Sequence, residues 1–442
     1  MSIKDLYFCK KLSFRHPMAR HWLRTLADEA KISADELQSI NTRRCLQLAR
    51  YAITTIPFYM KKYTSAGIEV GDIKDDAAFA RLPILTKHEV RNHAHEMIRQ
   101  DDSLDNLATS ATGGSTGEPV RFYRDPGLPG KALGWHRVCD LGVSLADNHG
   151  VVGRILPKFD WKYNIACLYN LTKTAYLDAK TITSETMQRF YPDLKHSKAT
   201  YIYGYGGGIY EFSKFLSDAD LVLPTLKAII ATSSPLAEFQ RAAMERTFKC
   251  KVYDQYGCCE VPWLAMECQA QEGLHAFHSI RRIEIVDENQ NRCRLGQVGD
   301  ILITNAIDYR FPIIRYALGD RSAYVSGDCL CENHSPRIET VRGRVTDCFT
   351  LPNGVIAGDY LTTIFDDYPE AVSGFQVYQY RDLRVELRVV LNSHHSESRN
   401  EVVNVGRTLE ERLQGLPFQL KYVNEIPHEQ GKTRFVINEN ML

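Results

Sequence analysis

The chain has 442 residues, of which 44% are hydrophobic and 24% charged, the balance of a globular protein. Its 54 Lys and Arg residues match 54 Asp and Glu residues, so neither nucleic acid nor an anionic membrane is expected as the main partner. No apolar run approaches the roughly 18–20 residues of a membrane helix, and the charged N-terminus lacks a secretory signal. We therefore expect no membrane span, a cytoplasmic location, and two or three domains of roughly 100–200 residues each.

Two capping boxes predict helices within the first hundred residues. Ser33 and Glu36 have the spacing of such a box and open a long segment at 34–57. Thr86 and Glu89 repeat the pattern before residues 87–98. The N-terminal region is therefore expected to be helical.

The middle of the chain alternates between predicted strands and helices. Residues 235–248 have helical periodicity, with Pro235 in the first turn, and lie between two apolar runs. This alternation is typical of βαβ units, which form sheets with parallel strands. The predicted strands are residues 200–205, 226–232 and 250–257.

The pattern changes near residue 280 to closely spaced strands, which indicate a β-rich subdomain on the α/β core. Beyond residues 343–347 the remaining chain predicts a small α+β domain. The strands expected in the first region are 281–287, 299–305, 313–318 and 322–325. The second region is expected to contain strands at 374–380, 383–391 and 418–423 and a helix at 398–413.

A glycine-rich loop at 112–119 is the sharpest local signal in the sequence. Its glycines let backbone N–H groups approach an anion, and Ser115 and Thr116 add hydroxyl donors. The loop is not a Walker A motif, because no lysine follows Gly117. Taken alone, it fits a phosphate-binding loop or a polar surface turn about equally.

This loop resembles the phosphate loop of the adenylate-forming superfamily of acyl-CoA synthetases and ligases. Four later segments resemble further motifs of that superfamily and occur in the expected order. Taken singly, Glu260, Asp320 and Lys432 could each be an ordinary surface residue, but the shared order argues against that interpretation. The segments are Tyr-Gly-Cys-Cys-Glu (256–260), Arg-Tyr-Ala-Leu-Gly-Asp (315–320), Gly-Arg-Val-Thr-Asp (343–347) and Pro-His-Glu-Gln-Gly-Lys-Thr-Arg (427–434).

The resemblance is strongest to the branch that contains phenylacetate–CoA ligases and CapK-type capsular-polysaccharide proteins. Residues 56–59 and 82–87 are similar to the helical N-terminus of that branch, and residues 373–379 to the C-terminal domain on the CapK side. The resemblance implies an α/β fold with a large adenylation domain at 1–344, containing mixed and parallel sheets. A small mobile α+β lid at 345–442 would turn about Asp347.

The resemblance also implies a role for each motif residue. Glu260 would hold Mg²⁺, Lys432 would contact the reacting carboxylate and the α-phosphate, and Asp320 would accept from both ribose hydroxyls. Cys259 stands where the family usually has Thr, so one hydroxyl contact to ATP is absent. The residues implied to bind ATP are Thr112, Gly113, Gly114, Ser115, Thr116, Gly117, Ser233, Ser234, Pro235, Tyr256, Gly257, Asp320 and Arg344, with Lys432, Glu260 and Thr116 as the catalytic residues.

The implied reaction is ATP-dependent formation of an acyl-AMP from a carboxylic acid. Transfer of the acyl group to CoA is expected, with a pocket suited to an aryl or small acid formed by Tyr203, Tyr205, Gly206 and Gly207. One alternative is an amide-forming ligase with an amine acceptor, in capsular-polysaccharide or secondary-metabolite assembly. Another is an inactive nucleotide-binding protein, which Cys259 slightly favours. A homodimer is compatible with the resemblance.

Cysteine and histidine residues form two short-range pairs that predict a zinc site. Cys268 and His275 form one pair, and Cys329 and Cys331 the other. His278 and His334 are rival ligands, and a set of buried thiols is the alternative. Related ligases carry a similar pattern, although there the second Cys of the C-x-C is followed by Gly-Arg. Four protein ligands would leave no open position, so the metal would be structural.

Overall fold

The computed structural model describes two compact units, each built from segments that are discontinuous in sequence. Unit 1 comprises Leu6–Asp140 and Tyr256–Glu339, and unit 2 comprises Leu141–Gln255 and Thr340–Leu442. The domain boundary expected after Arg344 lies outside the described residues and stays a prediction. The structure describes residues 10, 17–29, 31–111, 120–128, 138–144, 146–153, 172–179, 181–331, 333–341, 349–352, 354–356, 361, 364–365, 367–368, 370–429 and 432–440.

Helices form the N-terminal part of unit 1, and both predicted capping boxes are confirmed. The Ser33 hydroxyl accepts from the Glu36 N–H at 3.3 Å, and Thr86 accepts from Glu89 at 3.2 Å. The second box opens a shorter helix than expected, because it tightens into a 3₁₀ turn after His93. The α-helices are α2 (Pro17–Glu29), α3 (Ala34–Thr55), α4 (Pro57–Ser65), α5 (Asp76–Ala80) and α6 (Lys87–His93).

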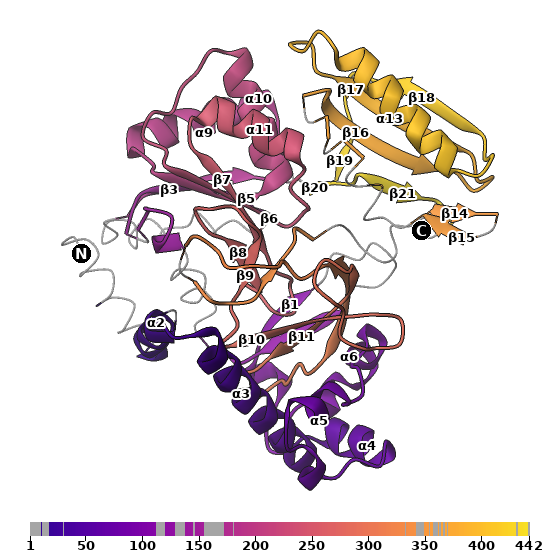
Figure 1. Ribbon diagram of the computed structural model, residues 1–442. Helices are drawn as coiled ribbons and strands as arrows, with labels where there is room; N and C mark the ends of the chain where they lie inside the picture. The colour runs from indigo at the N-terminus through magenta and orange to yellow at the C-terminus, as the bar shows by residue number, and fades with distance from the viewer. Residues whose placement is uncertain are drawn as a thin grey trace. The chain divides into compact units, whose positions relative to one another are not determined.

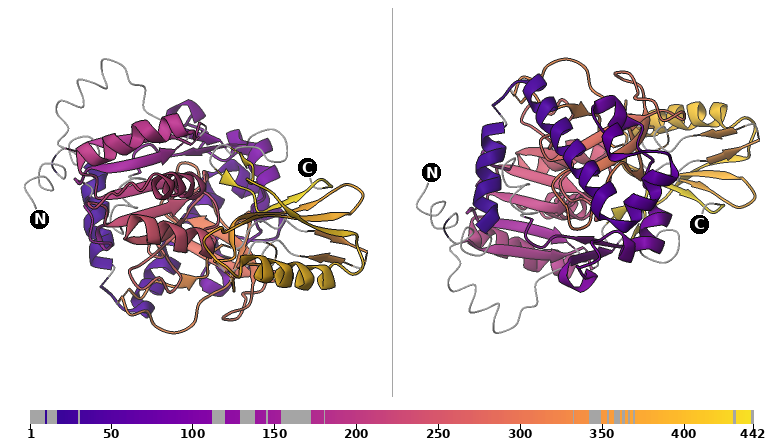
Figure 2. Two further views of the ribbon diagram at one scale, coloured as in Figure 1. Left: turned by 90° about the horizontal axis from the view of Figure 1, so that it is seen from above. Right: turned by 90° about the horizontal axis from the view of Figure 1, so that it is seen from below.

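Strands that pair antiparallel make up most of the rest of unit 1. The indigo helices α3–α6 lie against the sheet β10-β11-β12 (Figure 2, right). Asn41 of α3 donates to the backbone carbonyls of His278, at 2.5 Å, and Arg281, at 3.1 Å, which ties the helix to β10. The strands are β1 (Ala108–Ala111), β2 (Arg121–Arg124), β8 (Ala265–Glu267), β9 (Leu274–Ala276), β10 (Arg281–Val286), β11 (Gly299–Asn305), β12 (Tyr316–Ser322) and β13 (Arg337–Ile338).

Strand β12 differs from the prediction of two strands at 313–318 and 322–325. It begins only at Tyr316, because Arg315 has a left-handed φ of 48° that interrupts the extended backbone. It then continues through Ser322, and beyond it Tyr324 forms only isolated bridges, one of them with Ile338. One strand therefore carries both Tyr316 and Asp320.

Unit 2 contains the predicted parallel sheet, in the order β7-β6-β5-β3-β4. Every residue of β6 is buried, as is typical of a strand covered on both faces. Helix α11 starts at Glu238, so Pro235 precedes the helix instead of lying in its first turn as expected; Ala237 is the extended N-cap. The strands are β3 (His149–Gly153), β4 (Thr174–Asp178), β5 (Tyr201–Tyr205), β6 (Ala228–Thr232) and β7 (Lys251–Tyr256), with helices α9 (Ser184–Ser197), α10 (Gly206–Asp218) and α11 (Glu238–Phe248) (Figure 1).

The C-terminal part of unit 2 has the predicted α+β arrangement. Strands β16 (Val372–Gln379) and β17 (Val385–Leu391) pair antiparallel, while β18 (Phe418–Tyr422) and β21 (Val436–Asn438) flank them as parallel neighbours. Helix α13 (Ser398–Arg412) covers one face of this sheet (Figure 1). Two short hairpins pair β14 (Phe349–Leu351) with β15 (Gly354–Ile356) and β19 (His428–Glu429) with β20 (Lys432–Thr433). The predicted α/β class is therefore confirmed, and none of the described helices is long and apolar enough to cross a membrane.

A buried ion pair fixes the start of β12. The Arg315 guanidinium lies 3.2 Å from a Glu284 carboxylate oxygen, and the side chains are 1% and 9% exposed. Arg315 also donates to the carbonyl of Leu82. Leu85 forms two backbone hydrogen bonds with the start of β12. Its N–H donates to the Arg315 carbonyl, and its carbonyl accepts from the Ala317 N–H. The strand that carries Asp320 is thus anchored through both side-chain and backbone contacts.

Replacing Glu284 by Gln should destabilise the protein strongly. The change leaves the Arg315 charge buried without its counter-charge, and breaking such a pair typically costs about 3–5 kcal/mol. Urea unfolding measures the loss. As a control, Glu185→Gln removes one partner of a pair whose side chains are 75% and 73% exposed, and it should leave the midpoint almost unchanged. Equal shifts in the two variants would contradict the anchoring role of the pair.

Candidate active site

Several residues predicted to bind ATP lie outside the described part of the chain. These are the phosphate-loop residues Thr112–Gly117 together with Arg344, and the predicted hinge residue Asp347 lies outside it as well, so the roles of all of them stay predictions. The backbone of Lys432 is described in β20, which pairs with β19, but its side chain is not. Strands β1 and β2 pair through Ala111 and Arg121, so the predicted phosphate loop connects two antiparallel strands.

Unit 1 brings together three of the predicted site residues, Tyr256, Glu260 and Asp320. Tyr256 is the last residue of β7, and its hydroxyl donates to Oδ2 of Asp320 at 2.9 Å. Tyr316, the first residue of β12, donates to Oε1 of Glu260 at 3.4 Å. Two motifs that are distant in sequence therefore place their carboxylates next to each other's tyrosine.

Burial controls the protonation of the groups around these carboxylates. It raises the pKa values of the Tyr256 and Tyr316 hydroxyls well above their ordinary range, and the nearby carboxylates raise them further. Burial also raises the pKa of the Cys258 thiol, and the charge of Glu260 adds to the shift. All three groups therefore stay protonated at neutral pH and can act as donors toward the carboxylates.

Two hydrogen bonds hold the segment around Cys258 and Cys259 in place. The Val261 N–H donates to Sγ of Cys258 at 3.2 Å, and the Ser110 hydroxyl donates to the Cys259 carbonyl at 2.8 Å. Ser110 lies in β1, one residue before the strand ends and the predicted phosphate loop begins. The Cys259 side chain is exposed. The hydroxyl that the family usually has at this position is therefore replaced by an accessible thiol.

Unit 2 places the segment predicted to contact adenine beside the predicted acid pocket. Tyr205 of β5 pairs with Thr232 of β6, directly before Ser233 and Ser234. A Cβ on Gly206 would lie 3.7 Å from the Ser234 hydroxyl oxygen, so the two strand ends are close. Ligands of parallel α/β sheets bind at these carboxyl ends.

The glycines of the predicted acid pocket have a steric role. Gly204 has a φ of 151°, and a Cβ there would lie 2.0 Å from the Val152 carbonyl oxygen, so β5 can approach β3 only with glycine at this position. Gly206 and Gly207 are buried in the first turn of α10, whose N-cap is Tyr205. The tyrosines on either side of Gly204 are thereby fixed at the end of β5.

The four residues predicted to bind zinc come together in unit 1. Their donor atoms all lie within 4.8 Å of one another. The Sγ atoms of Cys268 and Cys329 are 3.5 Å apart, and Sγ of Cys331 lies 3.3 Å from Nε2 of His275. A tetrahedral site with Zn–S distances of about 2.3 Å separates its sulfurs by about 3.8 Å, so the donor set fits zinc.

The rival ligands His278 and His334 are not part of this group. His278 is buried and its Nε2 lies 2.9 Å from the Gln38 side-chain oxygen. Burial lowers the pKa of His278 to about 3. Burial and the neighbouring Cys329 and Cys268 thiols raise the pKa of Cys331 to about 12, so a thiolate there needs a nearby cation.

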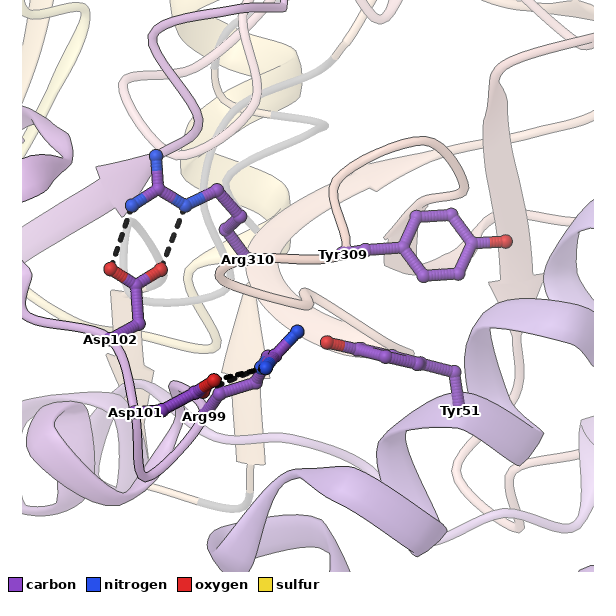
Figure 3. A pocket seen from close by; sticks show the side chains of 6 residues that line it. All are labelled: Tyr51, Arg99, Asp101, Asp102, Tyr309 and Arg310. Carbon is purple, nitrogen blue, oxygen red and sulfur yellow. Dashed lines mark hydrogen bonds and ion pairs between the residues drawn. The ribbon is translucent and has the colours of Figure 1, made fainter.

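Unit 1 also contains a cavity of about 360 Å³ that no sequence pattern indicates. Two tyrosine rings and two Arg–Asp pairs form its walls, as Figure 3 shows. Arg310 binds Asp102 with both nitrogens, at 2.7 and 2.8 Å, and holds the pKa of that carboxyl well below its usual range. Because each arginine already has an aspartate partner, the cavity offers no uncompensated charge. The lining residues are Tyr51, Arg99, Asp101, Asp102, Tyr309 and Arg310.

Comparison with known proteins supports the interpretation of the motifs. A model of the CapK C-terminal domain matches residues 349–439. Over 437 residues the chain is 23% identical to Protein CapK of Staphylococcus aureus, covering 91% of this chain and 90% of CapK. It is 22% identical over 431 residues to the phenylacetate-coenzyme A ligase of Escherichia coli strain K12, covering 90% of this chain and 94% of the ligase.

Solved structures share the fold. A crystal structure of 2-hydroxyisobutyryl-CoA ligase, in the postadenylation state with R3-HIB-AMP, is 18% identical with a TM-score of 0.76 and covers 93% of this chain and 91% of the ligase. The anthranilate CoA ligase AuaEII with anthranoyl-AMP is 14% identical with a TM-score of 0.53, covering 76% of this chain and 66% of that one. The predicted resemblance is confirmed: over most of its length the chain is similar to Protein CapK and to phenylacetate-coenzyme A ligases, and residues 349–439 match the CapK C-terminal domain.

Proposed function

We propose that this protein activates a carboxylic acid with ATP as an acyl-AMP and transfers the acyl group to CoA. The observation that carries the proposal is the pairing of Glu260 and Asp320 with the tyrosines of each other's motif, in a chain that aligns along most of its length with phenylacetate-coenzyme A ligases. Chemistry at the α-phosphorus depends mainly on positioning and on neutralising charge. Asp320 would serve positioning, and Glu260 would hold the cation that neutralises charge.

Asp320 and Glu260 have different tasks in this mechanism. Asp320, partly exposed on β12, would accept hydrogen bonds from the ribose hydroxyls of ATP through its two oxygens. Glu260 is a buried carboxylate, and carboxylate oxygens are ligands that Mg²⁺ takes in proteins, so it would serve as a ligand of Mg²⁺. When bound, Mg²⁺ would neutralise charge on the phosphates. The phosphate loop at 112–117 would hold those phosphates through backbone N–H groups.

Binding of the acid is assigned to the end of β5. Tyr203 and Tyr205 flank the obligatory Gly204, and Gly206 and Gly207 open α10 without side chains, which would suit a flat or small acyl group. Ser233, Ser234 and Pro235 follow the paired end of β6 and would contact the adenine. An aryl or short-chain carboxylic acid is therefore the proposed substrate class.

We assign the adenylation domain to residues 1–344 and a lid to 345–442, with Asp347 as the hinge. Lys432 would enter the site from the lid during the first half-reaction, and Arg344 would contact the ribose. The cytoplasmic location and a homodimer remain predictions from the sequence.

A second candidate is an amide-forming ligase that passes the acyl group to an amine. The match of residues 349–439 to the CapK C-terminal domain favours it, because that domain would help to choose the acceptor. An inactive nucleotide-binding protein is a weaker third candidate, since Glu260 and Asp320 are both retained and each is hydrogen-bonded to a tyrosine of the other motif.

Pyrophosphate exchange across a panel of aryl and short-chain carboxylic acids tests the activity. Exchange that depends on one class of acid, followed by thioester formation with CoA, is the expected result. Amide formation with amines, and none with CoA, would replace the first candidate by the second. ATP binding without exchange for any acid would favour the inactive nucleotide-binding protein.

Replacing Lys432 by Ala should separate the two half-reactions. In the first step its ammonium would lie between the carboxylate and the α-phosphate, and removing such a preorganised charge costs a factor of about 10²–10³ in rate. Acid-dependent pyrophosphate exchange should fall accordingly, whereas transfer from a synthetic acyl-AMP to the acceptor should persist. The control is Lys421→Ala, which removes a half-exposed lysine of the same small domain and should retain both steps. Equal loss of both half-reactions would show that Lys432 is structural.

We also propose that Cys268, His275, Cys329 and Cys331 hold one structural Zn²⁺. The support is the clustering of three thiols and one imidazole at distances that fit a tetrahedron. These residues come from two distant segments of unit 1, so a bound ion would cross-link them. All four ligands belong to the protein, which leaves no position for a reacting water.

Elemental analysis of protein purified without chelators should find about one zinc per chain. Cys329→Ser should lose the metal and lower the unfolding temperature, because the remaining ligands no longer complete the tetrahedron. Cys139→Ser, which changes an exposed cysteine outside the cluster, should keep both. A metal-free parent protein would leave the cluster as a group of buried thiols.

A further inference from the structure

The two motif segments of unit 1 exchange hydrogen bonds in a reciprocal pattern. Each segment contains a tyrosine followed four positions later by a carboxylate. These are Tyr256 and Glu260 in one segment, and Tyr316 and Asp320 in the other. Tyr256 donates to Asp320 of the other segment at 2.9 Å, and Tyr316 donates to Glu260 at 3.4 Å. In both hydrogen bonds the tyrosine of one segment contacts the carboxylate of the other segment.

Both tyrosines lie in a packed environment that restricts their movement. Tyr256 is 9% exposed and Tyr316 1% exposed, and the Tyr316 ring packs edge-on against Phe122 with centroids 5.7 Å apart. The backbone of Tyr316 is held on both sides, since its neighbours Arg315 and Ala317 bond to Leu85. A hydroxyl fixed in this way also fixes the orientation of the carboxylate that it contacts.

We propose that Tyr256 and Tyr316 are positioning residues: Tyr256 orients Asp320 toward the ribose of ATP, and Tyr316 orients Glu260 toward Mg²⁺. The inference rests on the proposed function, because it takes Asp320 and Glu260 as the groups that contact nucleotide and metal. Each hydroxyl bonds one oxygen of a carboxylate and so restricts how that carboxylate can turn. Removing the hydroxyl while keeping the ring therefore isolates the orienting contact.

This arrangement separates the effects of the two hydroxyl groups. Loss of the Tyr256 hydroxyl acts on the ribose contact, which does not require a metal ion. Loss of the Tyr316 hydroxyl acts only on the part of the affinity that Mg²⁺ adds. A tyrosine that merely stabilised the fold would weaken both equally.

The experiment compares Tyr256→Phe and Tyr316→Phe with the parent protein by calorimetric titration of ATP, in EDTA and in Mg²⁺. Tyr256→Phe should weaken ATP binding roughly 5- to 30-fold in both buffers. Tyr316→Phe should leave binding in EDTA unchanged and remove most of the gain from Mg²⁺. Paramagnetic resonance with Mn²⁺ as the probe should show weaker ion binding to the ATP complex of Tyr316→Phe only.

Double variants test whether each tyrosine acts through its carboxylate. Tyr256→Phe added to Asp320→Ala should cause no further loss of ATP affinity, and Tyr316→Phe added to Glu260→Gln no further loss of Mn²⁺ binding. Tyr59→Phe is the matched control, because it removes a buried hydroxyl of unit 1 whose partner is the Pro312 carbonyl. It should bind ATP and Mn²⁺ like the parent.

Additive losses in the double variants, or equal losses in EDTA and in Mg²⁺, would overturn the inference. So would a Phe variant whose unfolding temperature falls well below that of Tyr59→Phe, since its hydroxyl would then be structural. If Asp320→Ala and Glu260→Gln weaken binding but the Phe variants do not, only the positioning role fails. If the two carboxylate variants bind ATP and Mn²⁺ like the parent, the proposed nucleotide site itself fails.

Discussion

Glu284 and Arg315 place two opposite charges inside unit 1, where neither has access to enough water for solvation. The pair holds the Arg315 side chain in place, the Arg315 backbone is left-handed, and β12 begins at the next residue. That start point decides the register of Tyr316 and Asp320, and through it the contacts with Tyr256 and Glu260. The geometry of the candidate site thus depends on an ion pair that contacts no substrate.

The proposed chemistry asks little of such a site beyond correct orientation and charge. The repulsion between the attacking carboxylate and the phosphates must be reduced, and the ribose of ATP must be held in place. No protein nucleophile is required. The thiol of Cys258 is accordingly a neutral neighbour of Glu260, held protonated by its surroundings. The same site suits CoA or an amine as acceptor, because both attack the acyl-AMP after the first step. Whether the acceptor would be CoA or an amine therefore depends on the regions of the protein that contact the acceptor.

Local features of the fold could be predicted from the sequence, and features set by distant contacts could not. The capping boxes at Ser33 and Thr86 follow from side chains three residues away, and the parallel strands from continuous apolar runs. The start of β12 could not be predicted, because it depends on Glu284 and Leu82. The motifs identified Tyr256 and Asp320, but their hydrogen bond joins residues 64 positions apart and leaves no pattern in the sequence. The cavity beside Tyr51 and Tyr309 was missed for the same reason.

Oxygen transfer tests the central claim, acyl-AMP formation, most directly. When the carboxylate attacks the α-phosphorus, one of its oxygens enters the new P–O bond and pyrophosphate leaves. The acceptor then attacks the carbonyl carbon, the C–O bond breaks, and AMP departs with that oxygen. With a substrate acid labelled with ¹⁸O in its carboxylate, mass spectrometry should therefore find one labelled oxygen in AMP and none in pyrophosphate. Label in orthophosphate, with ADP as the other product, would show attack at the γ-phosphorus and contradict the account.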